Sequence, residues 1–272
     1  MVNGLLRFGV ITDIHYGNGD RSTERKDLHT CFDFWEKNNV EFAVQLGDLI
    51  DGKGPEAEEN LEGITASLRE YPGPLYHVAG NHCLGAPLDR YLEETDLDSP
   101  YYTFSTNGIR FIVLHGMDIN PGSEPESAPD KARKKLLNHD PWANLYCGAI
   151  GEEQIHWLEV QLDDARASGE RVIIFCHFPL LKETSDEPHG LLWNHDEATD
   201  ILRRYENIIA CFTGHLHRSA YFKRYGIHFM TMAPFLKRNE PPYYSCGMIE
   251  LDNALLTVYD QDMSELHKLK IS

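Results

Sequence analysis

Two histidines that lie two residues apart, His215 and His217, follow the apolar run 208–212. That run contains β-branched residues and has the length of a buried strand. Because Gly214 has no Cβ, the backbone can bend sharply beyond the strand and turn both imidazoles into one cleft. Imidazole is a common ligand of divalent transition metals, so the pair indicates a metal site, although an isolated pair of this kind more often lies in an ordinary loop.

Four other predicted strands end in groups of matching chemistry. The run 6–12 leads into Asp13 and His15, whose side chains point the same way because side chains alternate along a strand. The runs 40–46, 75–79 and 171–176 lead into Asp48 and Asp51, Asn81 and His82, and His177, respectively. Ligands of open α/β sheets bind beyond the carboxyl ends of the strands, where all these groups fall.

The donor types favour a pair of divalent ions. Imidazole, carboxylate and amide oxygen together suit Mn²⁺, Fe²⁺ or Zn²⁺, and the lack of thiolate argues against a closed structural zinc site. Two ions that share a bridging carboxylate, about 3.5–4 Å apart, would clamp a phosphoryl group between them. The candidate ligands are too many for one ion with open positions: Asp13, His15, Asp48, Asn81, His177, His215 and His217.

The strands and helices that would position these groups alternate along the chain. The irregular segments 116–150 and 179–194 are expected to form a substrate wall beside the cleft. No internal repeat or linker divides the chain, so residues 1–272 are expected to form a single domain. Helices between the strands describe βαβ units with parallel strands. Helical periodicity covers 25–39, 55–70, 151–168 and 195–205, and hairpin patterns cover 101–114, 221–232 and 243–259.

The composition of the chain limits the kinds of partner that it is expected to bind. The chain has 272 residues and a formal net charge of -18, which argues against binding to nucleic acid or anionic lipid but leaves a small phosphate substrate open. No run has membrane-spanning length, and the N-terminus lacks the long apolar stretch of a signal peptide. Six cysteines without a Cys-x-x-Cys pair fit free thiols in a reducing compartment, so a cytoplasmic location is expected.

In chain order, five motifs resemble those of the calcineurin-like metallophosphoesterases: Asp13-x-His15, Gly47-Asp48-x-x-Asp51, Gly80-Asn81-His82, His177 and Gly214-His215-x-His217. The resemblance implies an α/β fold, a four-layer α/β/β/α sandwich with two mixed sheets. It assigns one metal to Asp13, His15 and His217, and a second to Asn81, His177 and His215, with Asp48 as the bridge. It also implies in-line attack by a hydroxide held between the metals.

Further motifs resemble the manganese-dependent ADP-ribose/CDP-alcohol diphosphatases and extend along nearly the whole chain. Those enzymes cleave the pyrophosphate bond of nucleotide conjugates, so the resemblance implies such a conjugate as substrate and manganese as the metal, with iron or zinc as alternatives. The chain departs from that family at His15, where Gln is frequent, and at Leu216, Arg218 and Ser219. The motifs lie at 76–84, 101–105, 151–158, 191–194 and 225–228.

His82 and Asp51 are the expected catalytic residues. His82, next to the ligand Asn81, is placed to stabilise phosphoryl charge or to protonate the leaving group. Asp51 follows Asp48 by three residues and would orient His82, as the resemblance also implies; its alternative role is to cap the turn.

Substrate contacts are expected from aromatic, amide and thiol groups near the cleft, because a nucleotide conjugate needs a flat surface for its base and polar groups for its ribose. Trp193 could instead pack its loop onto the next helix, and Cys83 could be a small core residue. His77 either supports a metal ligand or is an ordinary buried histidine. The expected contacts are Cys83, Trp193, Asn194, Tyr101 and Tyr102, with Tyr146 as a further stacking candidate.

The same residues are compatible with two other functions. A cyclic-nucleotide or broad-specificity phosphodiesterase would use the same metals, and His15 in place of Gln favours it. A non-catalytic scaffold on the same fold would be expected to have lost His82 or several ligands, and this chain has all of them.

Overall fold

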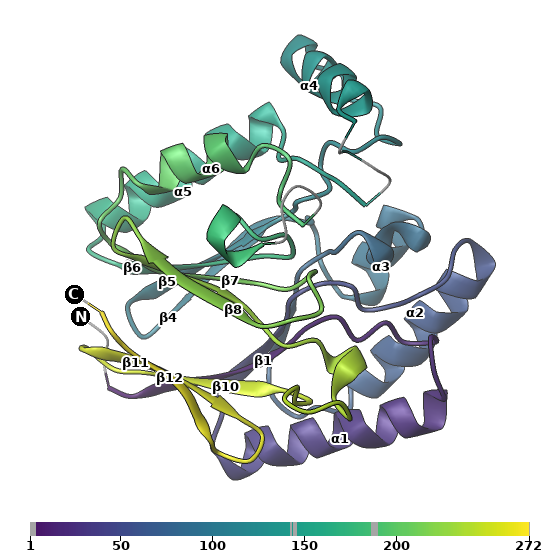
Figure 1. Ribbon diagram of the computed structural model, residues 1–272, viewed down its shortest axis with the longest axis vertical. Helices are drawn as coiled ribbons and strands as arrows, with labels where there is room; N and C mark the ends of the chain where they lie inside the picture. The colour runs from purple at the N-terminus through teal and green to yellow at the C-terminus, as the bar shows by residue number, and fades with distance from the viewer. Residues whose placement is uncertain (1–3, 142, 144–145, 186–189, 272) are drawn as a thin grey trace.

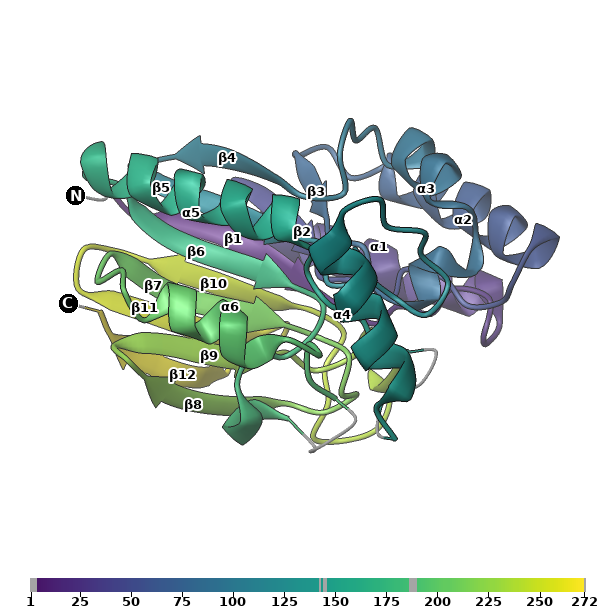
Figure 2. The same cartoon turned by 90° about the horizontal axis from the view of Figure 1, so that it is seen from above.

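In the computed structural model, which describes residues 4–141, 143, 146–185 and 190–271, two six-stranded mixed sheets pack face to face between outer helices (Figure 1). Helices α1 (Arg21–Lys37) and α2 (Pro55–Leu68) cover one sheet. Helices α5 (Glu152–Ala167) and α6 (His195–Leu202) cover the other, as a second view shows (Figure 2). The predicted α/β/β/α sandwich is therefore confirmed.

The first sheet has the order β12-β11-β10-β1-β2-β3. Strands β1, β2 and β3 are parallel, as predicted, because α1 and α2 return the chain between them. Strands β10, β11 and β12 extend the sheet as an antiparallel meander on the other side of β1. The strands are β1 (Leu6–Ile11), β2 (Phe42–Gln45), β3 (Leu75–His77), β10 (Gly247–Leu251), β11 (Leu255–Asp260) and β12 (Glu265–Lys270).

The second sheet has the order β4-β5-β6-β7-β9-β8. Its central strands β5, β6, β7 and β9 are parallel, and the hairpins β4–β5 and β8–β9 place an antiparallel strand at each edge. The strands are β4 (Tyr102–Thr106), β5 (Ile109–Leu114), β6 (Arg171–Cys176), β7 (Ile208–Thr213), β8 (Ala220–Arg224) and β9 (Ile227–Thr231).

Phenylalanines from both sheets form the centre of the sandwich. The ring of Phe8 stacks on Phe42 with the centroids 5.3 Å apart. Phe8 also meets three rings of the second sheet edge to face, at 5.7 Å for Phe111, 6.0 Å for Phe175 and 5.9 Å for Phe212. These buried contacts fix the two sheets against each other, and they thereby fix the positions of the strand ends that carry the candidate ligands.

The segment 116–150 is not irregular throughout, which corrects the prediction. It contains α4 (Ala128–His139), whose N-cap residue Ser127 accepts a hydrogen bond from the Asp130 N–H at 3.1 Å. Helix α4 projects from the body of the molecule (Figure 1), and of its residues only Asp130 and Leu137 are buried. Of its apolar residues only Leu137 is buried, so packing against the core contributes little to this helix.

Other elements also differ from the prediction. Helix α3 (Leu88–Glu94) and strand β12 were not expected. Helix α1 begins at Arg21 rather than at residue 25, because the Asp20 side chain caps it by accepting the Thr23 N–H at 2.8 Å. Among the described residues, no helix has both the length and the apolar composition that crossing a membrane requires.

His77, at the end of β3, is 6 % exposed, and its Nδ1 has no hydrogen-bond partner among the described residues. Its main chain is held by the Tyr102 hydroxyl, which accepts the His77 N–H at 3.0 Å and donates to the His77 carbonyl at 2.9 Å. Burial, and after it the charge of Arg69, lower the pKa of the imidazole to about 4. These contacts fit an ordinary buried histidine better than a group that supports a metal ligand.

Acidification should weaken the fold through His77. An unfolded histidine titrates near pH 6.5, so between about pH 6.5 and 4 the unfolded chain binds a proton that the folded chain does not. The stability that this neutral imidazole contributes is full above pH 6.5, and roughly 2 kcal/mol of it is lost at pH 5. Urea unfolding at pH 7 and pH 5 should show a smaller acid-induced loss for His77→Gln than for the natural chain. Equal losses in the two proteins would contradict this assignment.

Candidate metal centre

All seven predicted ligands meet at one place, where strands of both sheets end. Two of them, His215 and His217, are partly exposed, whereas the other five are buried. The first sheet supplies Asp13 and His15 after β1, Asp48 after β2 and Asn81 after β3, and the second sheet supplies His177 after β6 and His215 and His217 after β7. The candidate centre therefore spans the seam between the sheets.

Asp13, His15 and His217 form one donor group. The Nε2 atoms of His15 and His217 lie 3.0 Å apart. Asp13 Oδ1 lies 3.4 Å from His217 Nε2 and 3.9 Å from His15 Nε2. One donor atom from each residue lies within 4.8 Å of the other two, as binding to a single ion requires. These are the residues that the motifs assign to the first metal.

A second donor group lies around His177. Its Nε2 is 3.2 Å from His215 Nδ1 and 3.2 Å from Asn81 Oδ1. The same nitrogen is 3.2 Å from Asp48 Oδ2. Donor atoms of Asp48, His177 and His215 again lie within 4.8 Å of one another. Imidazole, carboxylate and amide oxygens crowded at these distances fit borderline divalent cations.

Asp48 lies between the two groups. Its Oδ2 is 3.2 Å from His177 Nε2 in one group and 3.7 Å from His15 Nε2 in the other. Its Oδ1 accepts a hydrogen bond from the His82 N–H at 2.8 Å. This central position fits the bridging role that the motifs imply.

Several groups that orient the ligands could not be found in the sequence. His177 Nδ1 donates to the Leu46 carbonyl at 2.9 Å, which leaves Nε2 for the centre. The Thr12 hydroxyl donates to Asp13 Oδ2 at 2.7 Å, and the His215 N–H lies 3.1 Å from the same oxygen. The role of a main-chain carbonyl cannot be predicted from residue types. Thr12 is the last residue of a predicted apolar strand, and nothing in the sequence indicates that it binds Asp13.

The main chain is left-handed at most of the ligands. Such φ values are uncommon for residues with a Cβ, and they cluster at functional sites. A left-handed residue in a strand-end turn bends the main chain at that one residue. The side chains that follow different strands can therefore converge on one place. The values are 51° at Asp13, 49° at His15, 51° at Asp48, 72° at His215 and 48° at His217.

Two glycines allow the strand ends to approach. A Cβ at Gly214 would lie 2.0 Å from Thr12 Oγ1, and a Cβ at Gly80 would lie 2.3 Å from Asp48 Oδ1. Both distances are far below any real contact, so neither position can accept a side chain without displacing its neighbour. The expectation that Gly214 avoids a clash is confirmed.

Two buried carboxylates dominate the electrostatics of the centre. Burial opposes ionisation of Asp13, but hydrogen bonds with His15 and His217 outweigh it and hold the pKa of Asp13 well below its usual range. Burial likewise opposes ionisation of Asp48, yet the charge of His177 lowers its pKa to about 2. In return, Asp48 raises the pKa of His177 to about 9 against the effect of burial. Both carboxylates are therefore held in the ionised form that binds cations.

His82 lies at the edge of the centre, paired with Asp51 as predicted. Its Nδ1 is 3.3 Å from Asp51 Oδ1, and its ring meets the His15 ring edge to face at 4.5 Å. The His82 side chain is 27 % exposed, so a substrate can reach it. Asp51 Oδ1 also accepts the Gly52 N–H at 2.8 Å, so the contacts of this carboxylate fit both the orientation of His82 and the capping of its turn.

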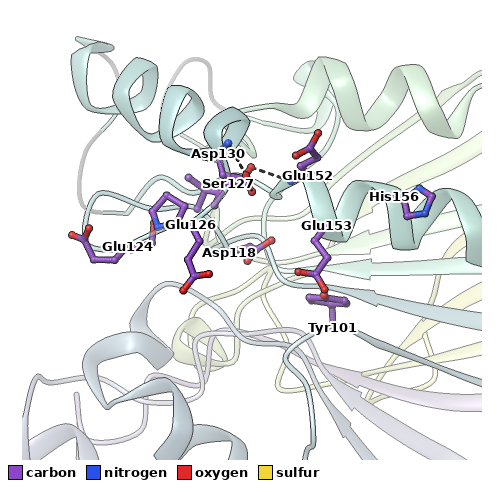
Figure 3. Close-up of a pocket in the computed structure, with 12 residues that line it drawn as sticks. Tyr101, Asp118, Glu124, Glu126, Ser127, Asp130, Glu152, Glu153 and His156 are labelled. Atoms are coloured by element: carbon purple, nitrogen blue, oxygen red, sulfur yellow. Dashed lines mark hydrogen bonds between the residues drawn. The ribbon is translucent and has the colours of Figure 1, made fainter.

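The predicted substrate residues near β3 and β4 are engaged in contacts other than with the metal centre. Cys83 has no exposed surface and accepts the Leu49 N–H at 3.4 Å, a core position that does not favour a substrate contact. The Tyr102 hydroxyl is engaged with the His77 main chain. Tyr101 packs against Trp157 at 4.9 Å and lines an acidic cavity of about 850 Å³ (Figure 3).

That acidic cavity has a structural explanation. None of its described lining residues is a candidate metal ligand. The Asp118 carboxylate accepts the Gly151 N–H at 2.9 Å, and the Asp130 carboxylate accepts the Glu152 N–H at 3.0 Å. Both therefore satisfy the first free N–H groups of α5 and interact favourably with its dipole.

Trp193 and Asn194 both contact the segment 140–150. The Trp193 indole N–H donates to Asp140, the C-cap residue of α4, at 2.9 Å, so the residue anchors its loop to α4 and not to the next helix, α6. Asn194 is 7 % exposed; its Oδ1 accepts the Ile150 N–H at 3.0 Å, and its Nδ2 donates to the Ile150 carbonyl at 3.0 Å. Direct substrate binding by either residue stays a prediction.

A sandwich of this topology, with Asp, Asn and His donors at the ends of strands from both sheets, defines a metallophosphoesterase. Residues 6–219 match the calcineurin-like phosphoesterase family, and the chain belongs to that family. The resemblance inferred from the five motifs is thereby confirmed.

Named relatives cover nearly the whole chain. The manganese-dependent ADP-ribose/CDP-alcohol diphosphatase of Arabidopsis thaliana is 31% identical, over 93% of this chain and 94% of the relative. The protein of the same name from Oryza sativa subsp. japonica is 30% identical, over 94% and 92%. A dimetal phosphatase from Danio rerio has a TM-score of 0.81 at 22% identity, over 98% of this chain and 99% of that one, which shows a shared fold.

Two separable donor groups predict two separable ions. Metal analysis and calorimetric titration of the natural chain should give two Mn²⁺ ions per chain. His217→Ala and His215→Ala are a matched pair on one loop, and each should retain one ion because each removes a donor from a different group. Asp48→Asn should weaken both ions, since Asp48 faces both groups. A natural chain that binds a single ion would contradict the dinuclear assignment.

Proposed function

We propose that this chain hydrolyses the pyrophosphate bond of small nucleotide conjugates, of the ADP-ribose and CDP-alcohol type, with two divalent metal ions and preferentially manganese. The observation that carries the proposal is the position of Asp48 between two donor groups, 3.2 Å from His177 and 3.7 Å from His15. Two ions held there would clamp one phosphoryl group from two sides.

The relatives support the substrate class and the metal. Both plant proteins have manganese dependence and ADP-ribose/CDP-alcohol hydrolysis in their names, and the similarity spans more than nine-tenths of each chain. Similarity over nearly the full length of both chains supports a shared substrate and not only a shared fold.

His82 would supply the proton for the leaving oxygen, and Asp51 would orient the His82 ring. When bound, the metals would neutralise phosphoryl charge and make a water molecule more acidic. The His82 Nδ1–H donates to Asp51, which fixes the ring and leaves Nε2 for the substrate. Hydrolysis breaks one P–O bond of the pyrophosphate bridge: the oxygen of water joins phosphorus, and the leaving oxygen receives a proton from His82.

A cyclic-nucleotide or broad-specificity phosphodiesterase is the second candidate. The observation that favours it is the imidazole of His15, 3.0 Å from that of His217, at a position where the ADP-ribose enzymes often have Gln. A panel of ADP-ribose, CDP-choline, cyclic AMP and a small chromogenic diester, assayed with Mn²⁺, separates the candidates. Release of AMP and CMP from the two conjugates supports the proposal, whereas faster turnover of cyclic AMP supports the phosphodiesterase.

Removal of the His82 imidazole should separate chemistry from metal binding. We expect His82→Ala to keep both ions and to lose about 10²–10⁴-fold in kcat, the usual loss for a general acid. Asp51→Asn should lose less, because it only orients the ring. Metal content measured beside kcat is the control. Loss of an ion in proportion to activity would instead identify His82 as a ligand.

A further inference from the structure

One of the three candidate stacking tyrosines, Tyr146, contacts the centre. Its ring lies nearly parallel to the His82 imidazole, with the centroids 5.6 Å apart and 10° between the planes. At that separation parallel rings are offset, so only part of the Tyr146 ring covers His82. Tyr146 is 50% exposed, so much of its surface stays open to solvent. An accessible aromatic surface thus adjoins the predicted general acid.

The main chain that presents Tyr146 is firmly anchored on its C-terminal side. Ile119 and Ala149 exchange two hydrogen bonds, both at 2.8 Å. The Gly148 carbonyl accepts the Trp193 N–H at 2.8 Å, and Cys147 is buried. The ring therefore stands at the edge of a fixed segment, and its position beside His82 follows from that anchoring.

Asn194 completes the anchor from another part of the chain. Its amide group binds both the N–H and the carbonyl of Ile150, and it also donates to Glu197 at 2.8 Å. With its oxygen and nitrogen both engaged, Asn194 is a positioning residue for the segment that carries Tyr146. The family-like motif at 191–194 thus contacts the segment that carries Tyr146.

We propose that Tyr146 determines specificity by stacking on the nucleobase of the substrate. The inference rests on the proposed function. His82 protonates the leaving oxygen, so a group that lies on the ring adjoining His82 belongs to the leaving half of the conjugate. A flat base on an open tyrosine ring gains stacking energy that a ribose or an alkyl alcohol does not. The nucleoside monophosphate is therefore the leaving group, and water attacks the phosphorus of the other half.

Binding of the two products of ADP-ribose tests the base contact directly, because AMP and ribose 5-phosphate both carry a phosphate but only AMP has a base. With the Mn²⁺-loaded protein, calorimetry should show that Tyr146→Ala binds AMP about tenfold more weakly and binds ribose 5-phosphate unchanged. Tyr146→Phe should retain AMP affinity, since it keeps the ring. The control Tyr225→Ala removes a similarly exposed ring from the distant β8–β9 turn and should bind both ligands normally. Equal weakening of both ligands in Tyr146→Ala, or of neither, would overturn the proposal.

Hydrolysis in ¹⁸O-labelled water tests the direction of cleavage. The label should enter ribose 5-phosphate from ADP-ribose and phosphocholine from CDP-choline, because the nucleotide leaves with its own oxygen. Label in AMP or CMP would overturn the inference while leaving the proposed function intact. Failure of the natural chain to cleave either conjugate would instead reject the proposed function.

Discussion

Two carboxylates that are closed off from water, Asp13 and Asp48, are the constraint on which the centre depends. An ionised carboxylate in a protein interior is costly unless charged or hydrogen-bonding partners surround it. Here burial opposes ionisation of both carboxylates, yet hydrogen bonds with His15 and His217 lower the pKa of Asp13, and the charge of His177 lowers the pKa of Asp48. In return, and again against the effect of burial, the two carboxylates raise the pKa of both His15 and His177. The buried carboxylates are thereby kept ionised, and their negative charge favours binding of cations in the cleft.

The sandwich supplies the rigidity that such a cluster needs. Ligands come from strands of both sheets, and the edge-to-face contacts of Phe8 with the rings of the second sheet oppose sliding of one sheet past the other. Three of the five strands, β1, β2 and β7, then lead into left-handed residues, a conformation that persists only where the surrounding packing determines it. The donors are therefore placed by the core, with close approaches at Gly80 and Gly214 that no larger residue permits.

This arrangement explains which parts could be predicted from the sequence. Strands buried on both faces read as apolar runs, and ligands one to a few residues beyond them share a cleft by the rule for parallel strands. Helix α4 buries few residues and lies in a segment rich in prolines, and the first turn of α1 depends on the cap at Asp20. The hydrogen bond between the Leu46 carbonyl and His177 could not be predicted, because every residue has a main-chain carbonyl.

The residues expected to contact the substrate could not be ranked from the sequence in the same way. Tyr101, Tyr102 and Tyr146 are equivalent as sequence letters, and only packing separates them: one lines the acidic cavity, one binds the His77 main chain, and one lies on His82. Asn194 reads as a polar group for a ligand, yet its hydrogen bonds go to Ile150 and Glu197. The candidate metal ligands thus lie at strand ends, where their spacing can be recognised in the sequence, whereas the ring proposed to select the base lies on a segment positioned by contacts distant in sequence. If that proposal holds, substitutions in this segment would change the substrate without disturbing the buried carboxylates, because loops vary more readily than the core that carries the site.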